Sequence, residues 1–328
     1  MKLYHHLTHE QRCQIYALKK RGFSQSEMAK DMGVSQGTIS RELARNQGKR
    51  GYRFKQASEF AARRGSAGNR HVTALTPSLI AIAESMLVGS QWSPEQIAGR
   101  LLREHGMRIS HESLYSHIWH NKRAGGTLYK HLRQGGKKRN RRSGKHSGRG
   151  MIPGRIDIKE RPEIVESKTR LGDWELDSII GSKHVGSITS MVERKSKLTK
   201  LVLQNGPTAN ATRKSIVRRL KPIRRHVLTL TADNGKEFAQ HARISRELEG
   251  GFYFATPYHS WERGLNEHTN GLVRQYFPKG LDFATITNID VQRVEDLLNN
   301  RPRKRLGYRS PNEVFAQLAA ASNYALRI

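Results

Sequence analysis

Three acidic residues of this 328-residue chain stand where carboxylates can hold metal ions. Asp177 lies inside a strand-like stretch, and Asp233 directly follows the apolar stretch 227–232. Glu267 comes later, with 33 residues between it and Asp233. Hard divalent cations prefer carboxylate oxygens, and two of them together stabilise the entering and leaving oxygens of a phosphoryl transfer. We therefore expect these three acids to be catalytic and to bind two Mg²⁺ or Mn²⁺ ions.

Other interpretations of these acids remain open. Asp173 and Glu175 alternate with Asp177 along the strand and share its face, so either is an alternative ligand. Asp233 begins an Asp-Asn-Gly sequence, which is typical of a turn. Glu262 competes with the later glutamate, although a glycine separates it from the body of the expected helix.

The third acid belongs to the stretch 256–278, which has no apolar stripe wide enough for an ordinary core helix. From residue 265 we nonetheless expect a helix. Glu267, Asn270 and Arg274 then share one face because they are three and four residues apart. Gly271 lies on that face and lets another group approach the backbone closely.

The charge of the chain indicates a polyanionic partner. It has 59 Lys and Arg against 28 Asp and Glu, a formal charge of +31 and a pI of about 10.7. Nucleic acid is the partner that such an excess favours. An acidic membrane surface is the alternative, but no apolar run approaches the ~18 residues of a spanning helix, and the N-terminus lacks a signal-peptide core. The single Cys13 excludes an internal disulfide and a multi-cysteine zinc site. We expect a soluble cytoplasmic protein with no membrane partner.

Residues 1–48 have the pattern of a helix-turn-helix DNA-binding domain. Thr8, Ser24 and Ser35 are the expected caps of three helices, and Gly33 supplies the turn before the third. Residues early in the third helix would face the major groove of double-stranded DNA. The candidate DNA contacts are Ser35, Gln36, Thr38, Ser40 and Arg41. A plain three-helix bundle with a solvated polar face is the alternative.

Residues 76–121 repeat this pattern and predict a second, helix-turn-helix-like DNA-binding module. We expect helices that begin at Pro77, at Pro94 and after a Ser110 cap. The exposed reading face would carry His111, Glu112, Ser113 and Ser116, with His111 and Ser113 as candidate DNA contacts. The histidines His111, His117 and His120 are better explained as solvated or phosphate-facing side chains than as a metal site, because no cysteine accompanies them.

Two basic linkers are expected, over residues 49–75 and 122–160. Residues 135–150 contain no acid and cannot form a core, so we place the main domain boundary there. The candidate phosphate contacts in this run are Lys137, Lys138, Arg139, Arg141 and Arg142. By composition alone the run also fits a nuclear-localisation-like signal.

Residues 161–328 have the pattern of an α/β domain with a mixed sheet. Expected strands cover 172–181, 185–193, 197–204, 227–232 and 252–255, with a helix over 209–223 and late helices from 265, over 291–300 and over 312–320. Three strands in a meander, a helical crossover and a further strand predict a ribonuclease-H-like fold. The chain as a whole is expected to be multidomain, with all-α helix-turn-helix modules preceding this α/β domain.

With these residues assembled, the chain resembles the DDE transposases of bacterial insertion sequences, and most closely the family of insertion sequence thirty. The resemblance covers nearly the whole chain. It includes GVSQGTISREL, GDWELDSIIG, TADNGKEFA, PYHSWERGLNEHTNGLVRQYFPKG and LNNRPRKRLGYRSPNEVF. The spacing of 33 residues between the last two acids matches the family pattern. One departure is Leu176, where the pattern leads us to expect a glycine.

The resemblance implies a transposase that binds the terminal inverted repeats of a mobile element through its N-terminal modules. It implies Mg²⁺-dependent cutting at the element's end by Asp177, Asp233 and Glu267, and attack of the released 3′-OH on target DNA. It also implies a homo-oligomer, at least a dimer, that acts at the bacterial nucleoid. Asn270 and Arg274 would position DNA near the metals. Further phosphate contacts would come from Arg263, Arg301, Arg303, Lys304 and Arg305.

Three alternatives to this function remain. A repressor with two DNA-binding modules and an α/β ligand-binding domain would not need three converging acids. A simple metal-dependent nuclease would cut DNA and never join it. An inactive transposase copy would keep the fold, although the intact acids and uninterrupted motifs argue against this alternative.

Overall fold

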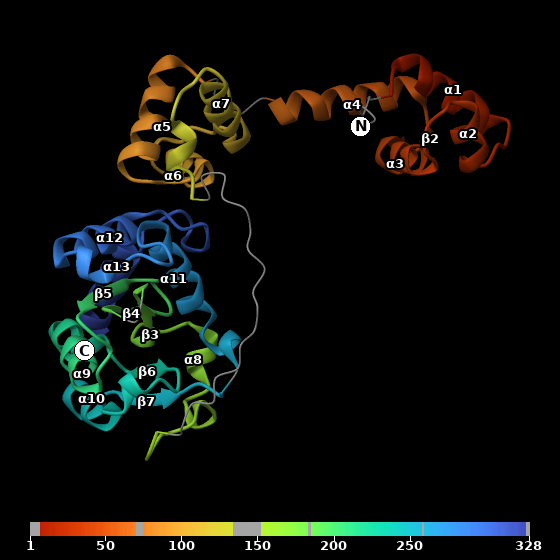
Figure 1. Cartoon of the computed structure of the whole chain (residues 1–328). Coiled ribbons are helices and arrows are strands. Elements are labelled where there is room, and N and C mark those ends of the chain that lie inside the picture. Colours follow the sequence, from red (N-terminus) through yellow and green to blue (C-terminus); the bar gives the residue numbers. More distant parts are fainter. Residues whose placement is uncertain (1–6, 70–74, 134–151, 183–184, 258, 326–328) are drawn as a thin grey trace. The chain divides into compact units, whose positions relative to one another are not determined.

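The structure is a computed structural model and describes residues 7–69, 75–133, 152–182, 185–257 and 259–325 (Figure 1). The chain divides into two compact units, Met1–Thr73 and Ala74–Ile328. Among the described residues, none of the helices is both long and apolar enough to span a membrane.

The first unit is helical, with one short ribbon. It contains α1 (His9–Lys20), α2 (Gln25–Asp31), α3 (Gln36–Asn46), β1 (Gln47–Gly48), β2 (Gly51–Tyr52) and α4 (Phe54–Asn69). The three predicted caps are present: Thr8 and Ser24 form reciprocal capping boxes, and the Ser35 side chain accepts from the backbone N–H of Thr38. These caps satisfy N–H groups that the first turn of a helix leaves unpaired.

The segment predicted as the first linker is structured. Tyr52 and Ala57 are buried with Ile15 and Ile39 of the helix-turn-helix, so β2 and α4 extend the core of this domain. Basic side chains hide this apolar pattern in the sequence because they lie between the core positions of α4 and face outward.

The second unit begins with three helices, α5 (Pro77–Gly89), α6 (Pro94–His105) and α7 (His111–Arg123), which we call the second helical module. They share a core that includes Leu87, Leu101 and Ile118. The predicted helix starts at Pro77 and Pro94 are confirmed, and α6 ends at Gly106, which has a φ of 65°. Ser110 differs from the prediction, because it occupies the cap position of α7 without a side-chain cap hydrogen bond.

The second predicted linker is structured at both described ends. A 3₁₀ helix (Leu128–His131) packs on α7, and another (Ile158–Glu160) lies beside the last strand of the sheet. Residues 134–151 lie outside the described residues.

The rest of the second unit is the sheet domain. Its strands are β3 (Asp173–Ile180), β4 (Ser187–Glu193), β5 (Thr199–Gln204), β6 (Thr229–Ala232) and β7 (Gly251–Phe254). Its helices are α8 (Ile164–Ser167), α9 (Ala209–Leu220), α10 (His241–Leu248), α11 (Gly264–Tyr276), α12 (Asn288–Asn300) and α13 (Pro311–Ala325). The strand order is β5-β4-β3-β6-β7, with β3, β4 and β5 antiparallel to one another and β6 and β7 parallel to β3. This is the mixed sheet of the predicted ribonuclease-H-like fold.

Alternation along β3 directs its side chains into different layers. Trp174 and Leu176 face a core formed with α9 and α10, whereas Ile179 faces a core formed with α11 and α12 (Figure 1). Leu176, the one departure from the family pattern, is fully buried in the first of these cores. The acids of β3 therefore lie on the α11 side.

The free edge of β5 is covered by α12. Asn299 accepts from the Thr199 N–H at 2.8 Å and donates to its carbonyl at 2.7 Å, and Glu295 accepts from the Leu201 N–H at 2.7 Å. Glu295 is 1% exposed and also binds Arg219 of α9 at 2.5 and 2.6 Å. One carboxylate therefore joins an edge strand to two helices, and it satisfies an edge that would otherwise remain unpaired.

The second helical module contacts the first turn of α13 and the segment that joins α12 to α13. Arg100 of α6 binds Glu313 at 2.8 and 2.6 Å, and Lys304 binds Glu95 at 2.6 Å. A Cβ atom at Gly99 would lie 2.3 Å from the Tyr308 ring. Helix α6 can approach this ring because residue 99 is glycine and has no Cβ.

Replacing Glu295 by alanine is expected to lower the free energy of unfolding by about 3 kcal/mol, because Arg219 and the Leu201 N–H lose their buried partner. Urea unfolding measures this change. Asp296→Ala, on the exposed face of the same helix, is the matched control and is expected to stay within about 0.5 kcal/mol of wild type. Equal unfolding midpoints for the two variants would show that Glu295 does not hold the edge strand.

Candidate active site

The register of two parallel strands brings Asp177 and Asp233 together. In the β3–β6 pair Asp173 lies opposite Thr229, and Glu175 lies opposite Thr231. Asp177 and Asp233 each follow the last of these pairs by two residues. Neighbouring strands are about 4.8 Å apart, so the two carboxylates lie side by side at the carboxyl end of β6, a usual place for function in such sheets.

The guanidinium of Arg263 lies between these two carboxylates. Its Nη1 is 3.5 Å from Asp177 Oδ1, and its Nη2 is 3.7 Å from Asp233 Oδ2. The three side chains are 13–23% exposed, and the Arg263 Nε has no hydrogen-bond partner. The sheet end thus forms a half-buried pair of acids with one protein cation held between them.

The electrostatics of Asp177 follow from this arrangement. Burial raises the pKa of its carboxyl, the charge of Arg263 opposes that shift, and the nearby Asp233 raises it further. Desolvation and a like charge both disfavour ionisation, so a cation between the two acids stabilises their charged forms. A divalent ion would do so more strongly than a guanidinium, and the donor set therefore fits a hard cation.

Helix α11 is tied to β3 beside this pair. The Asn270 side chain donates from Nδ2 to Asp177 Oδ2 at 2.7 Å, and its Oδ1 accepts from Ser190 of β4 at 2.8 Å. Arg274 donates to the Ile180 carbonyl at 2.8 Å. Asn270 therefore orients the Asp177 carboxylate, and both predicted DNA contacts on this helix bind the protein's own strand.

Glu267 lies in the first turn of α11 and precedes Asn270 by three residues, a spacing that places these two side chains on one helix face. Arg263 comes directly before the helix. Glu267 itself is exposed. Within the described part of the chain, no three His, Cys, Asp or Glu side chains are arranged to hold a metal ion. The structure thus pairs Asp177 with Asp233 and places Glu267 on the adjoining helix.

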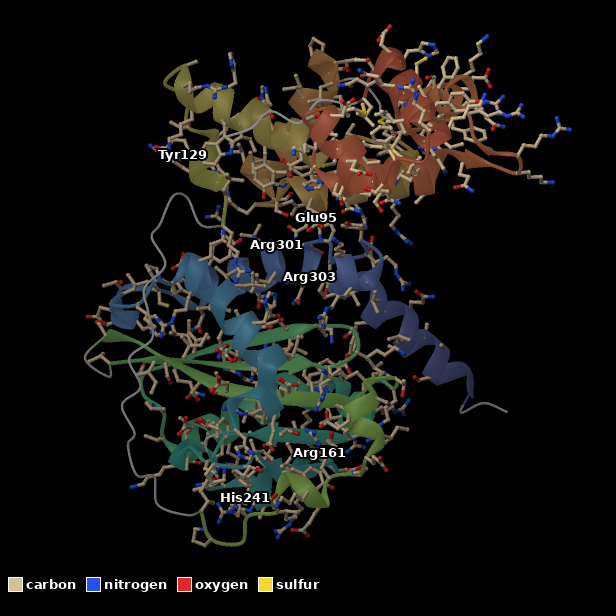
Figure 2. All side chains as sticks on the ribbon, turned by 90° about the vertical axis from the view of Figure 1, so that its right-hand side faces the viewer. Glu95, Tyr129, Arg161, His241, Arg301 and Arg303 are labelled. Atoms are coloured by element: carbon tan, nitrogen blue, oxygen red, sulfur yellow. The ribbon has the colours of Figure 1, made fainter. Side chains whose placement is uncertain are left out.

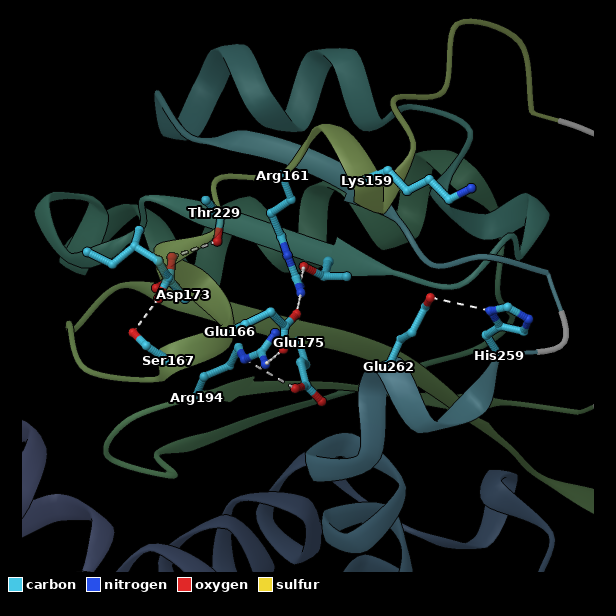
Figure 3. Close-up of polar contacts among 12 residues, drawn as sticks. Lys159, Arg161, Glu166, Ser167, Asp173, Glu175, Arg194, Thr229, His259 and Glu262 are labelled. Atoms are coloured by element: carbon cyan, nitrogen blue, oxygen red, sulfur yellow. Dashed lines mark hydrogen bonds and ion pairs between the residues drawn. The ribbon is translucent and has the colours of Figure 1, made fainter.

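Glu175 anchors the start of α11. It is 1% exposed, and its Oε2 accepts from the Asn266 N–H at 2.9 Å. Burial raises the pKa of Glu175, while Arg194, with its Nε 3.6 Å away, opposes the shift. Figure 3 shows this carboxylate beside Arg194, which with Arg161 also binds Glu166. Glu175 therefore fixes the backbone one residue before Glu267.

The other candidate acids have local partners. Asp173 is fully buried, binds Arg170 at 2.9 Å and accepts from the Thr229 hydroxyl at 2.7 Å (Figure 3). Glu262 accepts from the backbone and hydroxyl of Thr256 at 2.8 and 3.0 Å. Asp173 and Glu262 therefore bind these local partners and not the Asp177–Asp233 pair.

The predicted DNA-reading residues of the first unit lie at the start of α3. Ser35, Gln36 and Arg41 are exposed, while Thr38 and Ser40 are half-buried. Ser35 caps the helix, so its side chain has a structural role there. Gln36 donates to Gln25 of α2 at 3.0 Å.

In the second helical module, His111 is exposed and Ser113 is half-buried at the start of α7. His117 binds Glu84 at 2.7 Å and His111 lies 3.3 Å from Glu112, so two of the three histidines have carboxylate partners. The predicted contacts Lys137, Lys138, Arg139, Arg141 and Arg142 lie outside the described residues.

Sequence reasoning missed the partners that build the site. Arg263 was expected on DNA phosphate, and its place between the acids follows from a strand register that no motif reveals. The role of Ser190 could not be recognised from the sequence, because serine is common in strands such as β4. The buried role of Glu175 had a signal in its alternation with Asp177, but that signal also fitted a metal ligand.

Comparison with known proteins agrees with this architecture. A family model described as a helix-turn-helix domain matches residues 4–46. The transposase for insertion sequence element IS4351 of Bacteroides fragilis is 45% identical, over 98% of each chain. The transposase for IS1086 of Cupriavidus metallidurans is 34% identical, over 97% of this chain and 96% of its own. Transposase InsI for IS30A of Escherichia coli is 32% identical, over 97% and 85%.

Among solved structures, the catalytic core domain of BIV integrase matches 46% of this chain and 97% of its own, with 22% identity and a TM-score of 0.37. The helix-turn-helix domain and the relatives that match nearly the whole chain place it in the transposase class. The identity and coverage of the relatives make the family plain: the chain belongs to the IS30 family of insertion-sequence transposases.

Replacing Arg263 by glutamine is expected to raise the affinity for Mn²⁺ about fivefold, because the ion no longer competes with a guanidinium for the two carboxylates. Calorimetric titration of the DNA-free protein with Mn²⁺ measures this affinity. Arg274→Gln is the control. It removes the same charge from a side chain of α11 that binds the Ile180 carbonyl and not the two acids. Weaker Mn²⁺ binding by Arg263→Gln than by this control would contradict the assignment.

Proposed function

We propose that this protein binds the terminal inverted repeats of a mobile DNA element, cuts a strand at each end and joins it to target DNA. One observation carries the proposal: a basic chain holds two aligned carboxylates, Asp177 and Asp233, that share a cation. A ligand-binding repressor needs no such pair. The helix-turn-helix supports recognition of double-stranded DNA through α3.

The reaction consists of two phosphoryl transfers. Water attacks the phosphodiester at the element's end, and the P–O bond to the 3′ oxygen breaks to leave a 3′-OH. That hydroxyl then attacks a phosphodiester of target DNA and displaces a new 3′-OH there. The first step is a hydrolysis and the second exchanges one ester bond for another. Both are in-line displacements at phosphorus, so a single site serves both.

The residues of this chain have separate roles in that site. Asp177, Asp233 and Glu267 would hold two Mg²⁺ or Mn²⁺ ions, which supply charge for the entering and leaving oxygens. Asn270 orients the Asp177 carboxylate through its 2.7 Å hydrogen bond. Glu175 fixes the start of α11 and thereby the position of Glu267. Arg263 neutralises the acids before DNA arrives and is then available to a phosphate.

The partners follow from the reaction. Two inverted-repeat ends must meet at one target, which requires a homo-oligomer of at least two chains. The net charge of +31 favours association with DNA. Such a protein would work in the bacterial cytoplasm at the nucleoid.

The variants Asp177→Asn, Asp233→Asn and Glu267→Gln are expected to lose cleavage and joining by at least about 10³-fold, because each removes a charge from the site of phosphoryl transfer. The assay uses Mg²⁺ and duplexes from the DNA that flanks the gene, with products resolved on denaturing gels. Their affinity for the same duplexes is expected to remain within about threefold of wild type.

Asp296→Asn, on the exposed face of α12, is the control variant for this assay. Wild-type activity in the three site variants would remove them from the active site and favour a repressor. Cleavage without any joined product would favour a simple nuclease. Activity of the wild type that needs no divalent ion would also contradict the proposal.

A further inference from the structure

The segment that leads into the sheet domain, residues 152–158, lies along the outer edge of β7, the last strand of the sheet. We call it the edge segment. Ile152 is 4% exposed and packs in the core that includes Phe254. The Ile156 carbonyl accepts from the Phe254 N–H at 2.9 Å, and Asp157 pairs with Phe254 as a parallel bridge. The edge segment belongs to the stretch predicted as a linker, yet it pairs with an edge that would otherwise be open.

Contacts on both sides of residue 155 hold the backbone of the edge segment. His241, which starts α10 and is 6% exposed, donates from Nε2 to the Gly154 carbonyl at 3.1 Å. Figure 2 shows His241 at the end of the sheet domain where the edge segment lies. Gly154 has a φ of 67°, in the left-handed region that favours glycine. The side chain of residue 155 is therefore presented from a fixed backbone.

The Arg155 side chain extends from the edge segment to the loop that follows β6. Its Nη1 donates to Asn234 Oδ1 at 2.5 Å, and its Nη2 binds Asp157 Oδ2 at 3.0 Å. Asp157 also accepts from the Lys159 N–H at 3.1 Å, so the carboxylate that orients the guanidinium is itself held. Arg155 is 18% exposed. Its guanidinium is thus fixed in a half-buried position against the amide of Asn234.

Asn234 directly follows Asp233 and bridges the ends of two strands. Its Nδ2 donates to the Ala255 carbonyl at 2.7 Å, next to the backbone hydrogen bond from the Ala255 N–H to the Ala232 carbonyl. A guanidinium only donates hydrogen bonds, so Arg155 requires the amide oxygen of Asn234 on its side. The amide nitrogen is then left for Ala255. Arg155 thereby sets the orientation of this amide.

The chain on either side of this bridge leads to the acidic site. Asp233 Oδ1 accepts from the Gly235 N–H at 3.1 Å, and its Oδ2 is 3.7 Å from Arg263. Asn234 stands between Asp233 and Gly235, so a rotation of its backbone would change both contacts. Beyond Ala255 the chain continues to Arg263 and α11. The hydrogen bonds of Asn234 therefore restrain the loop at the residue next to the carboxylate.

We propose that Arg155 is a positioning residue of the active site, which acts through Asn234 to hold the Asp233 carboxylate in the geometry needed for catalysis. The inference rests on the proposed function, in which Asp233 is catalytic. The ion pair with Asp157 does not by itself account for the arginine, because a partly exposed pair contributes little to stability. The edge segment is therefore part of the working active-site domain, although it precedes residue 161, where the α/β domain was expected to begin.

The kinetic test compares Arg155→Gln with wild type in Mg²⁺-dependent cleavage of duplexes from the DNA that flanks the gene, at several DNA concentrations. The variant is expected to lower kcat about tenfold at an unchanged KM, because it loosens the reacting carboxylate and leaves DNA binding intact. Lys159→Gln removes one charge from the 3₁₀ helix that follows the edge segment, and this control is expected to match wild type. A raised KM at unchanged kcat would show a direct DNA contact and overturn the proposal.

A double-mutant cycle tests whether Arg155 acts through Asn234. Asn234→Ala is expected to lower kcat at least as much as Arg155→Gln does. Adding Arg155→Gln to Asn234→Ala is then expected to change kcat by less than about twofold, because the path through the amide is already lost. Losses that multiply in the double variant would show that Arg155 acts independently of Asn234 and would overturn the proposal.

Amide hydrogen exchange in the DNA-free protein gives a readout that needs no catalysis. The Gly235 N–H is buried and donates to Asp233, so its exchange reports whether the carboxylate and its loop stay in place. Arg155→Gln and Asn234→Ala are expected to accelerate this exchange at least about fivefold, and Lys159→Gln is expected to leave it unchanged.

Faster exchange confined to the edge segment would show a purely structural role for Arg155 and overturn the proposal, as would the wild-type rate at Gly235 in both variants. The exchange measurement also separates this proposal from the proposed function. A wild type that neither cuts nor joins DNA would refute the proposed function, while the exchange of Gly235 would still decide whether Arg155 holds the loop.

Discussion

The repulsion between two carboxylates at the ends of neighbouring parallel strands is the constraint on which the sheet domain depends. The β3–β6 register forces Asp177 and Asp233 into proximity, and burial makes their charge unfavourable without a cation. Arg263 supplies that cation in the structure. Arg263 directly precedes α11, which carries Asn270 and Glu267, so the position of this helix and its start decides how the acids are presented. Glu175 explains why α11 is fixed, since its buried carboxylate binds the backbone at the helix start.

Charge compensation is a second theme of the molecule. Inside the sheet domain, acids such as Glu166 and Glu295 neutralise buried guanidinium groups and join elements that are distant in the sequence.

Much of this architecture follows from local sequence. Capping residues such as Thr8 and Ser24 predicted helix starts, and apolar runs predicted all five strands of the sheet within a few residues. Other features depend on contacts that no local pattern encodes. The segment around Tyr52 resembled a basic linker because its charged residues mask the few that enter the core. Arg263 resembled a phosphate contact because the register that sets Asp177 beside Asp233 is a tertiary property. The roles of the three acids themselves stay a prediction that rests on this geometry.

The central claim is that Asp177 and Asp233 bind the same cation. Anomalous scattering from crystals soaked in Mn²⁺ tests it most directly. The account predicts a peak between the two carboxylates, in the place of the Arg263 guanidinium, with that side chain displaced. A peak that contacts neither carboxylate, or Arg263 still between them at saturating Mn²⁺, would contradict the account.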